Sequence, residues 1–274
     1  MNRPRRYLMC PPEHFQVIYR INPWMDPAAS VDSALAGKQW AQLRDTLSGL
    51  GHTVHELVPD PELPDMVYAA NGAFVLDGVA YGAKFRYPQR AAETAHHERW
   101  CRQHGLRYVA PTQVNEGEGD LAWAGELILA GHGLRTDPAA HGEVQEVFGR
   151  PVVSLRLVDP RFYHLDTALT VLRESTIDDS TGGPPRVAYY PAAFSSGSQQ
   201  VLRRLFPEAI LADEADAAAF GLNVVSDGRH VVINAEATGM VDKLAAAGYQ
   251  PVPVDLSELK KGGGSVKCCV LELR

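Results

Sequence analysis

The sequence predicts an α/β protein built from one strand and helix module that is repeated about an axis. Strand-like and helix-like segments alternate along the 274 residues, which is typical of α/β folds. Five strand-like segments also begin with a polar residue and then become apolar, at intervals of 49, 46, 57 and 45 residues. Such a period is typical of modules arranged around an axis, although an ordinary α/β chain can give similar intervals by chance. The leading residues are Asn71, Asp120, Asp166, Asn223 and Cys268.

Several segments have the apolar character of strands. Those led by Asn71, Asp120 and Asn223 continue through a glycine-containing turn into a second apolar run, which predicts three β-hairpins. In chain order the predicted strand regions are FQVIYR (15–20), GAFVLDGVAYGA (72–83), LAWAGELILAG (121–131), RVAYYP (186–191), NVVSDGRHVVINA (223–235) and SVKCCVLEL (265–273).

Five segments between these regions have helical character. The first places its apolar residues at roughly helical spacing between Ala34 and Leu50, and ends at Gly51, a residue type that often terminates helices. The predicted helices cover 31–51, 90–105, 137–148, 195–206 and 236–248.

Length and composition indicate a water-soluble enzyme-sized chain. With 45% hydrophobic residues it can bury one large core or two small ones, and the repeats favour a single domain over 1–274. The net charge of −7 and scattered basic residues argue against nucleic-acid binding. The basic start meets Pro11 and Pro12 after a few apolar residues, so we expect neither a signal peptide nor a membrane span. We therefore expect a cytoplasmic protein with reduced cysteines and a small-molecule substrate.

Cys268 is a candidate nucleophile. It follows three glycines that allow the backbone to approach a ligand closely, and it leads the last strand region. A cysteine attacks as its thiolate, which a neighbouring histidine can favour. If the segment is a strand, Cys268 and Cys269 point to opposite faces, so that one cysteine faces the pocket while the other packs in the core. A small buried hydrophobic role is the alternative for either cysteine.

His164 and Asp166 are candidates for proton transfer and substrate binding. In an extended segment they share one face, which directs an imidazole and a carboxylate to the same place. Nine other histidines compete for the role of His164.

The segment NEGEGD places three carboxylates close together, on Glu116, Glu118 and Asp120. On an extended strand all three lie on one side, which is unfavourable unless they meet a cation or share protons. A solvated acidic turn is an alternative, as is a magnesium or calcium site, although the spacing of a calcium loop is absent from this stretch. Arg86, Arg90 and Arg135 follow the hairpins, where their guanidinium groups could bind a carboxylate or lie on the surface.

Taken in order, these motifs resemble the guanidine-modifying, or pentein, superfamily of arginine deiminases, dimethylarginine dimethylaminohydrolases, arginine dihydrolases and amidinotransferases. The resemblance covers nearly the whole chain. It rests on INPWM (21–25), LPDMVYAANGAF (63–74), FRYPQR (85–90), NEGEGD (115–120), GHGLRTD (131–137), FYHLDT (162–167), YYPAAFS (189–195) and GGGSVKC (262–268).

The resemblance implies a five-bladed, pseudo-symmetric α/β propeller of ββαβ modules, in agreement with the repeats. It implies that Cys268 attacks the guanidinium carbon and forms a thiouronium intermediate, and that His164 protonates the leaving amine and then activates water. Asp120 and Asp166 would pair with the guanidinium nitrogens. Neither a metal nor an organic cofactor is required.

The sequence departs from the family pattern in two places. The usual Glu-Gly-Gly-Asp is EGEGD here, so that Glu116 or Glu118 could be the catalytic acid, and we favour Glu118. Asn71 stands where deiminases carry an aspartate, and its amide adds no negative charge. Asn71 and Asn22 resemble the arginine dihydrolase branch, in which a second hydrolysis gives ornithine, ammonia and carbon dioxide. In that branch Arg90 and Arg135 would hold the substrate carboxylate.

Three functions are compatible with these features. The first is a hydrolase of C–N bonds in the guanidinium group of arginine or an N-substituted arginine. The second is an amidinotransferase, which passes the amidino group to an amine rather than to water. The third is a catalytically silent propeller that acts as a binding module, an interpretation opposed by the joint presence of cysteine, histidine and carboxylates. The sequence is also compatible with a homo-oligomer.

Overall fold

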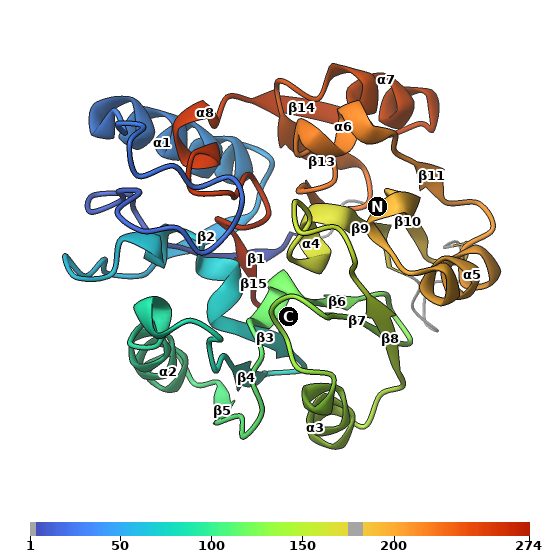
Figure 1. Ribbon diagram of the computed structural model, residues 1–274, viewed down its shortest axis with the longest axis horizontal. Helices are drawn as coiled ribbons and strands as arrows, with labels where there is room; N and C mark the ends of the chain where they lie inside the picture. The colour runs from blue at the N-terminus through green and yellow to red at the C-terminus, as the bar shows by residue number, and fades with distance from the viewer. Residues whose placement is uncertain (1–3, 175–182) are drawn as a thin grey trace.

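Five small sheets surround a central axis, and helices lie around the outside of the ring (Figure 1). The structure is a computed structural model that describes residues 4–174 and 183–274. Each sheet has three strands within this part of the chain. The five-module α/β propeller expected from the repeats is therefore confirmed.

The strands are short, and each of the five predicted helices is present, starting and ending within a few residues of the prediction. The strands are β1 (Arg6–Met9), β2 (Thr53–Glu56), β3 (Ala73–Leu76), β4 (Val79–Gly82), β5 (Arg107–Val109), β6 (Leu121–Trp123), β7 (Ile128–His132), β8 (Val152–Arg156), β9 (Leu169–Arg173), β10 (Arg186–Tyr189), β11 (Ile210–Leu211), β12 (Val225–Ser226), β13 (His230–Asn234), β14 (Gln250–Val254) and β15 (Leu271–Glu272). The helices are α1 (Ser33–Gly49), α2 (Glu93–Gln103), α3 (Ala139–Phe148), α4 (Leu165–Ala168), α5 (Ser196–Leu205), α6 (Glu214–Ala218), α7 (Thr238–Ala246) and α8 (Ser257–Lys260).

Every module has the same plan. A first strand pairs antiparallel with a second, a helix crosses the outside, and a third strand pairs parallel with the second, as in β3, β4, α2 and β5. The first strands lie innermost, because β3 contacts β15, β6 contacts β9 and β9 contacts β12. The start of each first strand therefore faces the axis, which is where the five leading residues were expected.

One module is formed by both ends of the chain. Its first strand, β15, pairs antiparallel with β1, with Tyr7 opposite Glu272 and Leu8 opposite Leu271. β1 then pairs parallel with β2, after the chain has passed through α1. This pairing completes the fifth three-stranded sheet from segments near the two ends of the chain.

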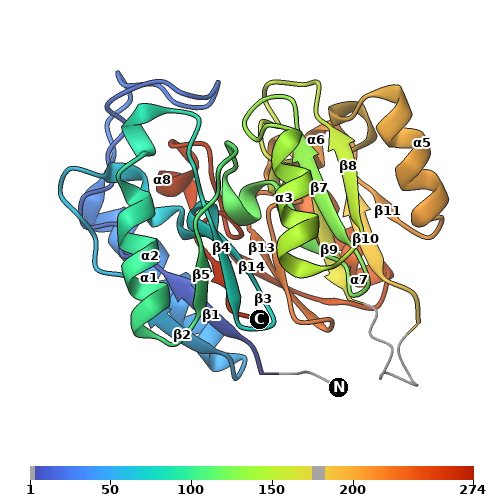
Figure 2. The same cartoon turned by 90° about the horizontal axis from the view of Figure 1, so that it is seen from below.

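Glycine is required at the tight hairpin turns. Between β3 and β4 the turn residues Asp77 and Gly78 both have positive φ angles, of 51° and 73°, as a type I′ turn demands. Figure 2 shows the tip of this hairpin at one end of the ring's axis, and the loop before α1 at the other end. The leading residues lie at the loop end, because each first strand runs from its leading residue toward the hairpin turn.

The prediction of a strand at 15–20 is wrong. Phe15 and Val17 are buried while Ile18 is 61% exposed, so the alternation typical of a strand is present, but no described strand pairs with this segment. It is a loop whose apolar side chains pack beside Tyr68 and Leu259. A segment can thus bury alternate residues against a neighbouring loop without joining a sheet.

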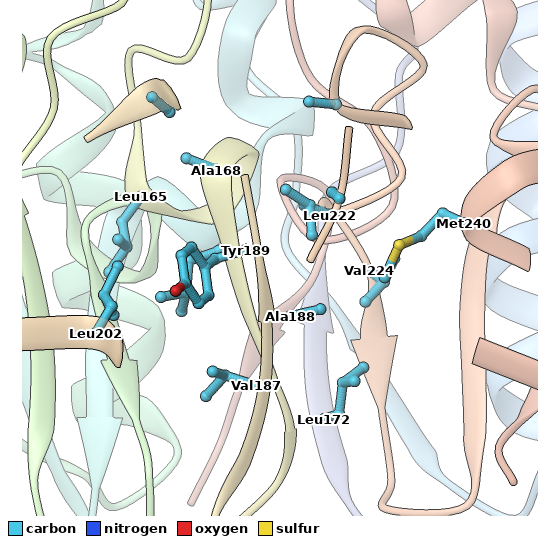
Figure 3. Packing of buried hydrophobic residues seen from close by; sticks show 14 of the residues in the cluster. Leu165, Ala168, Leu172, Val187, Ala188, Tyr189, Leu202, Leu222, Val224 and Met240 are labelled. Carbon is cyan, nitrogen blue, oxygen red and sulfur yellow. The ribbon is translucent and has the colours of Figure 1, made fainter. Parts of the chain in front are cut away.

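The hydrophobic core fixes the turns that carry two of the leading residues. Leu165 and Ala168 flank Asp166, and Leu222 and Val224 flank Asn223; all four belong to one buried cluster (Figure 3). Large-to-small changes in such a core cost about 2–5 kcal/mol. Among the described residues, no helix combines the length and hydropathy needed to cross a bilayer.

Candidate active site

The five leading residues lie together and are buried, with no more than 6% of any of them exposed. Hydrogen bonds join several of them around the axis. The Asn223 side chain donates to the Asp166 carbonyl (3.1 Å) and to Cys268 Sγ (3.2 Å), and Asp120 Oδ1 accepts from the Leu165 amide next to Asp166 (3.0 Å). The backbone of Ala70, which precedes Asn71, donates to the Cys268 carbonyl (3.1 Å). The sequence repeat therefore marks a real convergence of polar groups.

Asn223 holds the turn that carries Cys268. Its Oδ1 accepts from the backbone amides of Ser265 and Cys268, both at 3.2 Å, while its Nδ2 donates to the cysteine sulfur. The thiol in turn donates to Asp166 Oδ2 at 3.2 Å. Burial, and then the Asp166 carboxylate, raise the pKa of Cys268 well above its usual range. A cation must therefore enter the site before the thiolate becomes favourable.

The two adjacent cysteines do not lie on opposite faces of a strand, as the sequence predicted. They lie in a turn that precedes β15, and both are buried. Cys268 is bonded to Asn223 and Asp166, whereas Cys269 is fully buried in an apolar cluster. All four cysteines are free thiols. The division into one site cysteine and one packing cysteine thus arises from a turn rather than from strand alternation.

His164 forms a buried pair with Glu116. Its Nε2 lies 2.7 Å from Glu116 Oε2, which also accepts from Arg135 Nη1 at 2.8 Å. Burial alone would raise the pKa of Glu116, but the Arg135 guanidinium and the His164 ring outweigh it and hold that pKa well below its usual range. Glu116 is therefore a carboxylate at neutral pH. It fixes the orientation of the imidazole, whose Nδ1 is buried without a partner.

The sequence favoured Glu118 as the catalytic acid, but the carboxylate that pairs with His164 is that of Glu116. Residues 117–119 form a 3₁₀ turn rather than an extended strand, so the side chains of residues 116 and 118 do not share a face. Glu118 instead accepts from Lys267 Nζ (2.5 Å), Arg274 Nη1 (2.6 Å) and the Glu272 amide (2.8 Å). Glu116, the alternative in the sequence, is the one that contacts His164.

Asp120 is bound to the backbone. Its two carboxylate oxygens accept from the amides of Leu165 (3.0 Å) and Thr136 (3.3 Å). The Leu165 amide directly follows His164, so Asp120 fixes the position of the imidazole's own segment. Both oxygens already have donors in the structure, and we now propose that Asp120 positions His164 rather than binding a guanidinium group directly.

Asp166 is the carboxylate beside the thiol. Its Oδ1 is buried with no hydrogen-bond partner, while its Oδ2 accepts from Cys268. Burial raises its pKa to about 6, against a favourable contribution from His164. An ionised carboxylate with an unpaired oxygen is a receptor for a cation, and a guanidinium group supplies both the charge and the N–H donors.

Replacing Asp166 with asparagine is expected to raise the melting temperature of the ligand-free protein at about pH 7.5. The native pKa lies above the unfolded value of 3.8, so the protonated carboxyl is favoured in the native state. Burial of Asp166 therefore does not destabilise the fold below pH 3.8, and its destabilising effect grows as the pH rises to about 6. The penalty is roughly 2–3 kcal/mol above that window. Thermal melts at pH 5 and 7.5 should show a gain that shrinks at pH 5, with exposed Asp242→Asn as the control. A lower melting temperature at pH 7.5 would contradict the argument.

Asn71 and Arg90 are joined to two further carboxylates. Arg90 Nη1 donates to Asn71 Oδ1 (2.7 Å), and its Nε and Nη2 form a bidentate pair with Glu93 (both 2.8 Å). Asp65 lies 4.0 Å from Arg90 Nε and accepts from the Tyr19 hydroxyl (3.0 Å), but its Oδ1 is buried without a partner. Since Asn71 Oδ1 is occupied, its unpartnered Nδ2 is the atom left for a ligand.

Asn22 fastens its loop to the glycine run that precedes Cys268. Its Nδ2 donates to the Gly262 carbonyl (3.0 Å), and its Oδ1 accepts from the Trp24 amide (2.9 Å). Gly263 has a φ of +89°, and a Cβ there would lie 2.7 Å from the Asn22 amide, so the approach requires glycine. The glycine run thus serves the close contact of two loops.

Arg135 lies beneath this loop. It is placed between the rings of Tyr87 and Tyr163, with its guanidinium carbon 4.7 and 4.6 Å from their centroids, and it donates to the Ile21 carbonyl (2.9 Å). The two arginines expected to hold a substrate carboxylate are therefore both buried, and each is already paired with a glutamate of the chain. Binding of a substrate carboxylate by these two arginines remains a proposal. It requires guanidinium N–H groups that the two glutamates do not use.

Sequence reasoning assigned no individual role to three residues that the structure places at the site. Asn223 occupies a leading position of the repeat, and that position alone could have assigned it a role. Asp65 and Tyr163 belong to the quoted motifs, but nothing in their spacing indicates that they point inward. Tyr163 donates to the Gly263 carbonyl at 2.7 Å and so holds the glycine loop from below. No cluster of three or more His, Cys, Asp or Glu side chains suited to a metal ion occurs among the described residues.

Comparison with known proteins gives strong sequence matches, although no protein-family model matches the chain. The N(G),N(G)-dimethylarginine dimethylaminohydrolase of Mycobacterium tuberculosis is 54% identical over 271 residues, which are 99% of this chain and 86% of that protein. The bifunctional arginine dihydrolase/ornithine cyclodeaminase ArgZ of Synechocystis is 34% identical over 275 residues, which are 98% of this chain and 37% of that protein.

Solved structures give the same result. The N-terminal domain of ArgZ, crystallised as a cysteine-to-serine variant with its substrate, matches with a TM-score of 0.91 at 32% identity over 98% of each chain. The same domain, covalently bound to a reaction intermediate, also matches with a TM-score of 0.91. A dimethylarginine dimethylaminohydrolase adduct at 20% identity, with a TM-score of 0.76, shares the fold.

A propeller of five ββαβ modules with a buried thiol at its axis is the architecture of a cysteine-dependent amidine hydrolase. The sequence matches make the relationship more specific. The chain belongs to the guanidine-modifying, or pentein, superfamily, in the group that contains the dimethylarginine dimethylaminohydrolases and the arginine dihydrolases.

Proposed function

We propose that the chain hydrolyses the guanidinium group of arginine or a closely similar amino acid at Cys268. The observation that carries the proposal is a set of polar atoms around the thiol that are buried with no partner among the described residues. They are Asp65 Oδ1, Asn71 Nδ2, His164 Nδ1, Asp166 Oδ1 and Ser265 Oγ. An unsatisfied buried polar atom costs about 1–3 kcal/mol, so a group of them indicates that a polar ligand completes the site.

The first half of the reaction uses the thiol, the imidazole and one carboxylate. Asp166 Oδ1 accepts an N–H from the guanidinium, whose charge favours the Cys268 thiolate. The thiol proton passes to His164, and the sulfur then forms a bond to the guanidinium carbon. As the carbon–nitrogen bond breaks, its electron pair leaves with the amine, which takes a proton from His164. The product of this half-reaction is a thiouronium intermediate on Cys268.

The second half reverses the proton flow. His164, now neutral, accepts a proton from water, whose oxygen attacks the thiouronium carbon, and the thiolate of Cys268 leaves. Glu116 keeps the imidazole oriented and balances its charge through both halves. With arginine as the substrate this turnover gives citrulline and ammonia.

The amino-acid end of the substrate has suitable partners nearby. The unpaired Asp65 oxygen could accept from an α-ammonium group, and free N–H donors of Arg90 and Arg135 could bind an α-carboxylate. The pKa of Asp65 is raised by burial and that of Glu93 is raised to about 7 by burial, so a bound ammonium would also favour the charged form of this cluster.

Arginine is the first candidate substrate, followed by its N-methylated forms. The neutral Asn71 amide and the similarity to the ArgZ domain support an arginine dihydrolase, in which a second hydrolysis converts citrulline to ornithine, ammonia and carbon dioxide. The 54% identity to the M. tuberculosis dimethylarginine dimethylaminohydrolase supports removal of dimethylamine from dimethylarginine. Both use the same thiouronium chemistry.

Product analysis tests the proposal. The protein is incubated separately with arginine, N-methylated arginines, agmatine, and arginine plus glycine, and the products are identified by mass spectrometry. Ornithine with two equivalents of ammonia indicates a dihydrolase, while citrulline with dimethylamine indicates a dimethylargininase. Guanidinoacetate from arginine plus glycine would establish amidino transfer to an amine. If no guanidine compound releases ammonia or an amine, the hydrolase proposal is overturned.

A further inference from the structure

A cavity lies among the inner strands, on the hairpin side of the five leading residues. Asp166 lines it at the end nearest Cys268, and Lys267 and Glu118 line it as well. The cavity continues between the first strands of the modules toward the end where β15 and β1 meet. Arg5, Glu272 and Arg274 also line it, together with mostly apolar side chains of β6 and β9.

Lys267 and Glu118 form an ion pair at this cavity. Lys267 Nζ donates to Glu118 Oε2 (2.5 Å) and to the Val270 carbonyl (2.9 Å). The side chains are mostly buried, at 18% and 2% exposure, so water screens the pair only weakly. The Glu272 amide in β15 and the Arg274 side chain just after β15 both donate to Glu118. Both charges are therefore fixed in position.

The pair connects the two halves of the candidate active site. Lys267 directly precedes Cys268 in the turn, and its ammonium also closes that turn through Val270. Glu118 is two residues from Glu116, and the next residue, Gly119, lies against Asn71 Nδ2 and the His164 ring. The ion pair thus ties the turn of the nucleophile to the segment that carries the proton-transfer pair.

The charge state of Asp166 is sensitive to such neighbours. Its pKa of about 6 is close to a working pH, so modest fields decide whether it is ionised. The titratable groups that act on it are His164, Lys267 and Cys268, which favour the carboxylate, and Asp120, which opposes it. The other charged groups on the shared cavity are Glu118, Arg5, Glu272 and Arg274.

We propose that Lys267 and Glu118 are positioning residues, which hold the Cys268 turn against the His164 segment and place a fixed pair of charges on the cavity that Asp166 lines. The significance for catalysis rests on the proposed role of Asp166 in binding the guanidinium. The Lys267 ammonium favours the ionised form of Asp166. Glu118 holds this ammonium in place, and its negative charge partly offsets the effect of the ammonium on Asp166. The second glutamate of EGEGD then has a function without being the catalytic acid.

The test uses two substitutions with opposite expected effects. The Asp166 carboxyl is titrated by NMR in protein labelled with ¹³C at aspartate side chains, and Asp166→Asn identifies its signal. Lys267→Met is expected to raise the midpoint by about half a pH unit or more, because a nearby cation is lost. Glu118→Gln is expected to lower it by a similar amount, because an anion is lost. Lys267→Arg should restore a midpoint near that of the unmodified protein.

Kinetics provide the functional readout. The acidic limb of kcat/KM against pH should move in the same directions as the NMR midpoints, whereas a merely structural pair would lower activity in both variants without moving either limb. Equal or same-sign shifts in Lys267→Met and Glu118→Gln would overturn the proposal, as would unmoved midpoints in folded variants. The NMR titration needs no turnover, so it tests the ion pair even if no guanidine compound is hydrolysed.

Discussion

Replacing Cys268 with serine is expected to lower kcat by about 10⁴-fold or more, with little change in melting temperature. A serine hydroxyl is a far weaker nucleophile than a thiolate, and the substrate cation that favours thiolate formation cannot ionise a hydroxyl at neutral pH. The fold should persist, because Asn223 holds the turn through backbone amides as well as through the sulfur. Steady-state kinetics with the best substrate from the product analysis, together with thermal melts, measure both quantities.

The neighbouring cysteine is the matched control. Cys269 is fully buried in an apolar cluster, so Cys269→Ser places a hydroxyl where polar partners are scarce. The expected loss is about 1–3 kcal/mol of stability, while most activity remains below the melting temperature. A Cys269→Ser protein that folds but is inactive, beside an active Cys268→Ser protein, would show that the nucleophile has been misassigned.

Replacing Glu116 with glutamine is expected to lower kcat by about 10²–10³-fold. Glu116 orients the His164 imidazole and balances its charge, and it is also the carboxylate partner of Arg135, so an amide weakens both interactions. Kinetics should be accompanied by a thermal melt, because leaving Arg135 partly unpaired also costs stability. The decrease in kcat should persist when kcat is measured well below the melting temperature of the variant, where unfolding cannot cause it.

Two comparisons make this second prediction decisive. Glu118→Gln is expected to lower kcat at its optimal pH by less than about tenfold, since Glu118 contacts Lys267 and Arg274 instead of His164. Glu126 is an exposed residue between β6 and β7, so Glu126→Gln shows the effect of the same chemical change at a position of this module outside the site. If Glu118→Gln proved more damaging than Glu116→Gln, the assignment of the catalytic carboxylate would be reversed.

The site is strained electrostatically in a way that serves its function. A buried carboxylate and a buried thiol lie 3.2 Å apart; the hydrogen bond from the thiol favours the carboxylate, but the carboxylate disfavours ionisation of the thiol. A bound guanidinium resolves this conflict, because its charge stabilises the carboxylate and the thiolate together. Under the proposed function, binding of the substrate therefore prepares Cys268 as the nucleophile, whereas the thiol stays protonated in the empty site. This coupling would protect Cys268 from unselective oxidation.

The sequence predicted the convergence of polar residues well, because that convergence follows from the repeat. Asn71, Asp120, Asp166, Asn223 and Cys268 occupy equivalent points of five modules, and a ring brings equivalent points together whatever the details of each turn. The sequence could not decide which of Glu116 and Glu118 meets His164. That choice depends on a 3₁₀ turn of three residues, which has no periodicity to read.

Other errors have the same origin. Segment 15–20 has the alternation of a strand but packs as a loop, and the turn around Cys268 was expected to be extended. Asp120 carries the same carboxylate as Asp166 at an equivalent position, yet two backbone amides occupy its oxygens while one oxygen of Asp166 stays unpaired. Equivalent positions in a repeat can thus acquire different roles through their local backbone.

The sequence by itself determined the module, its fivefold repetition and the residues that face the axis, while the class of chemistry was implied by the resemblance to a known family. These features depend on periodic patterns and residue types, which are local properties of the chain. Tertiary structure alone decided which carboxylate orients the imidazole, which cysteine is bonded to the site and which polar atoms remain free for a ligand. Those outcomes depend on contacts between residues far apart in the sequence, such as Glu118 and Lys267, which are 149 positions apart, and no local pattern records them.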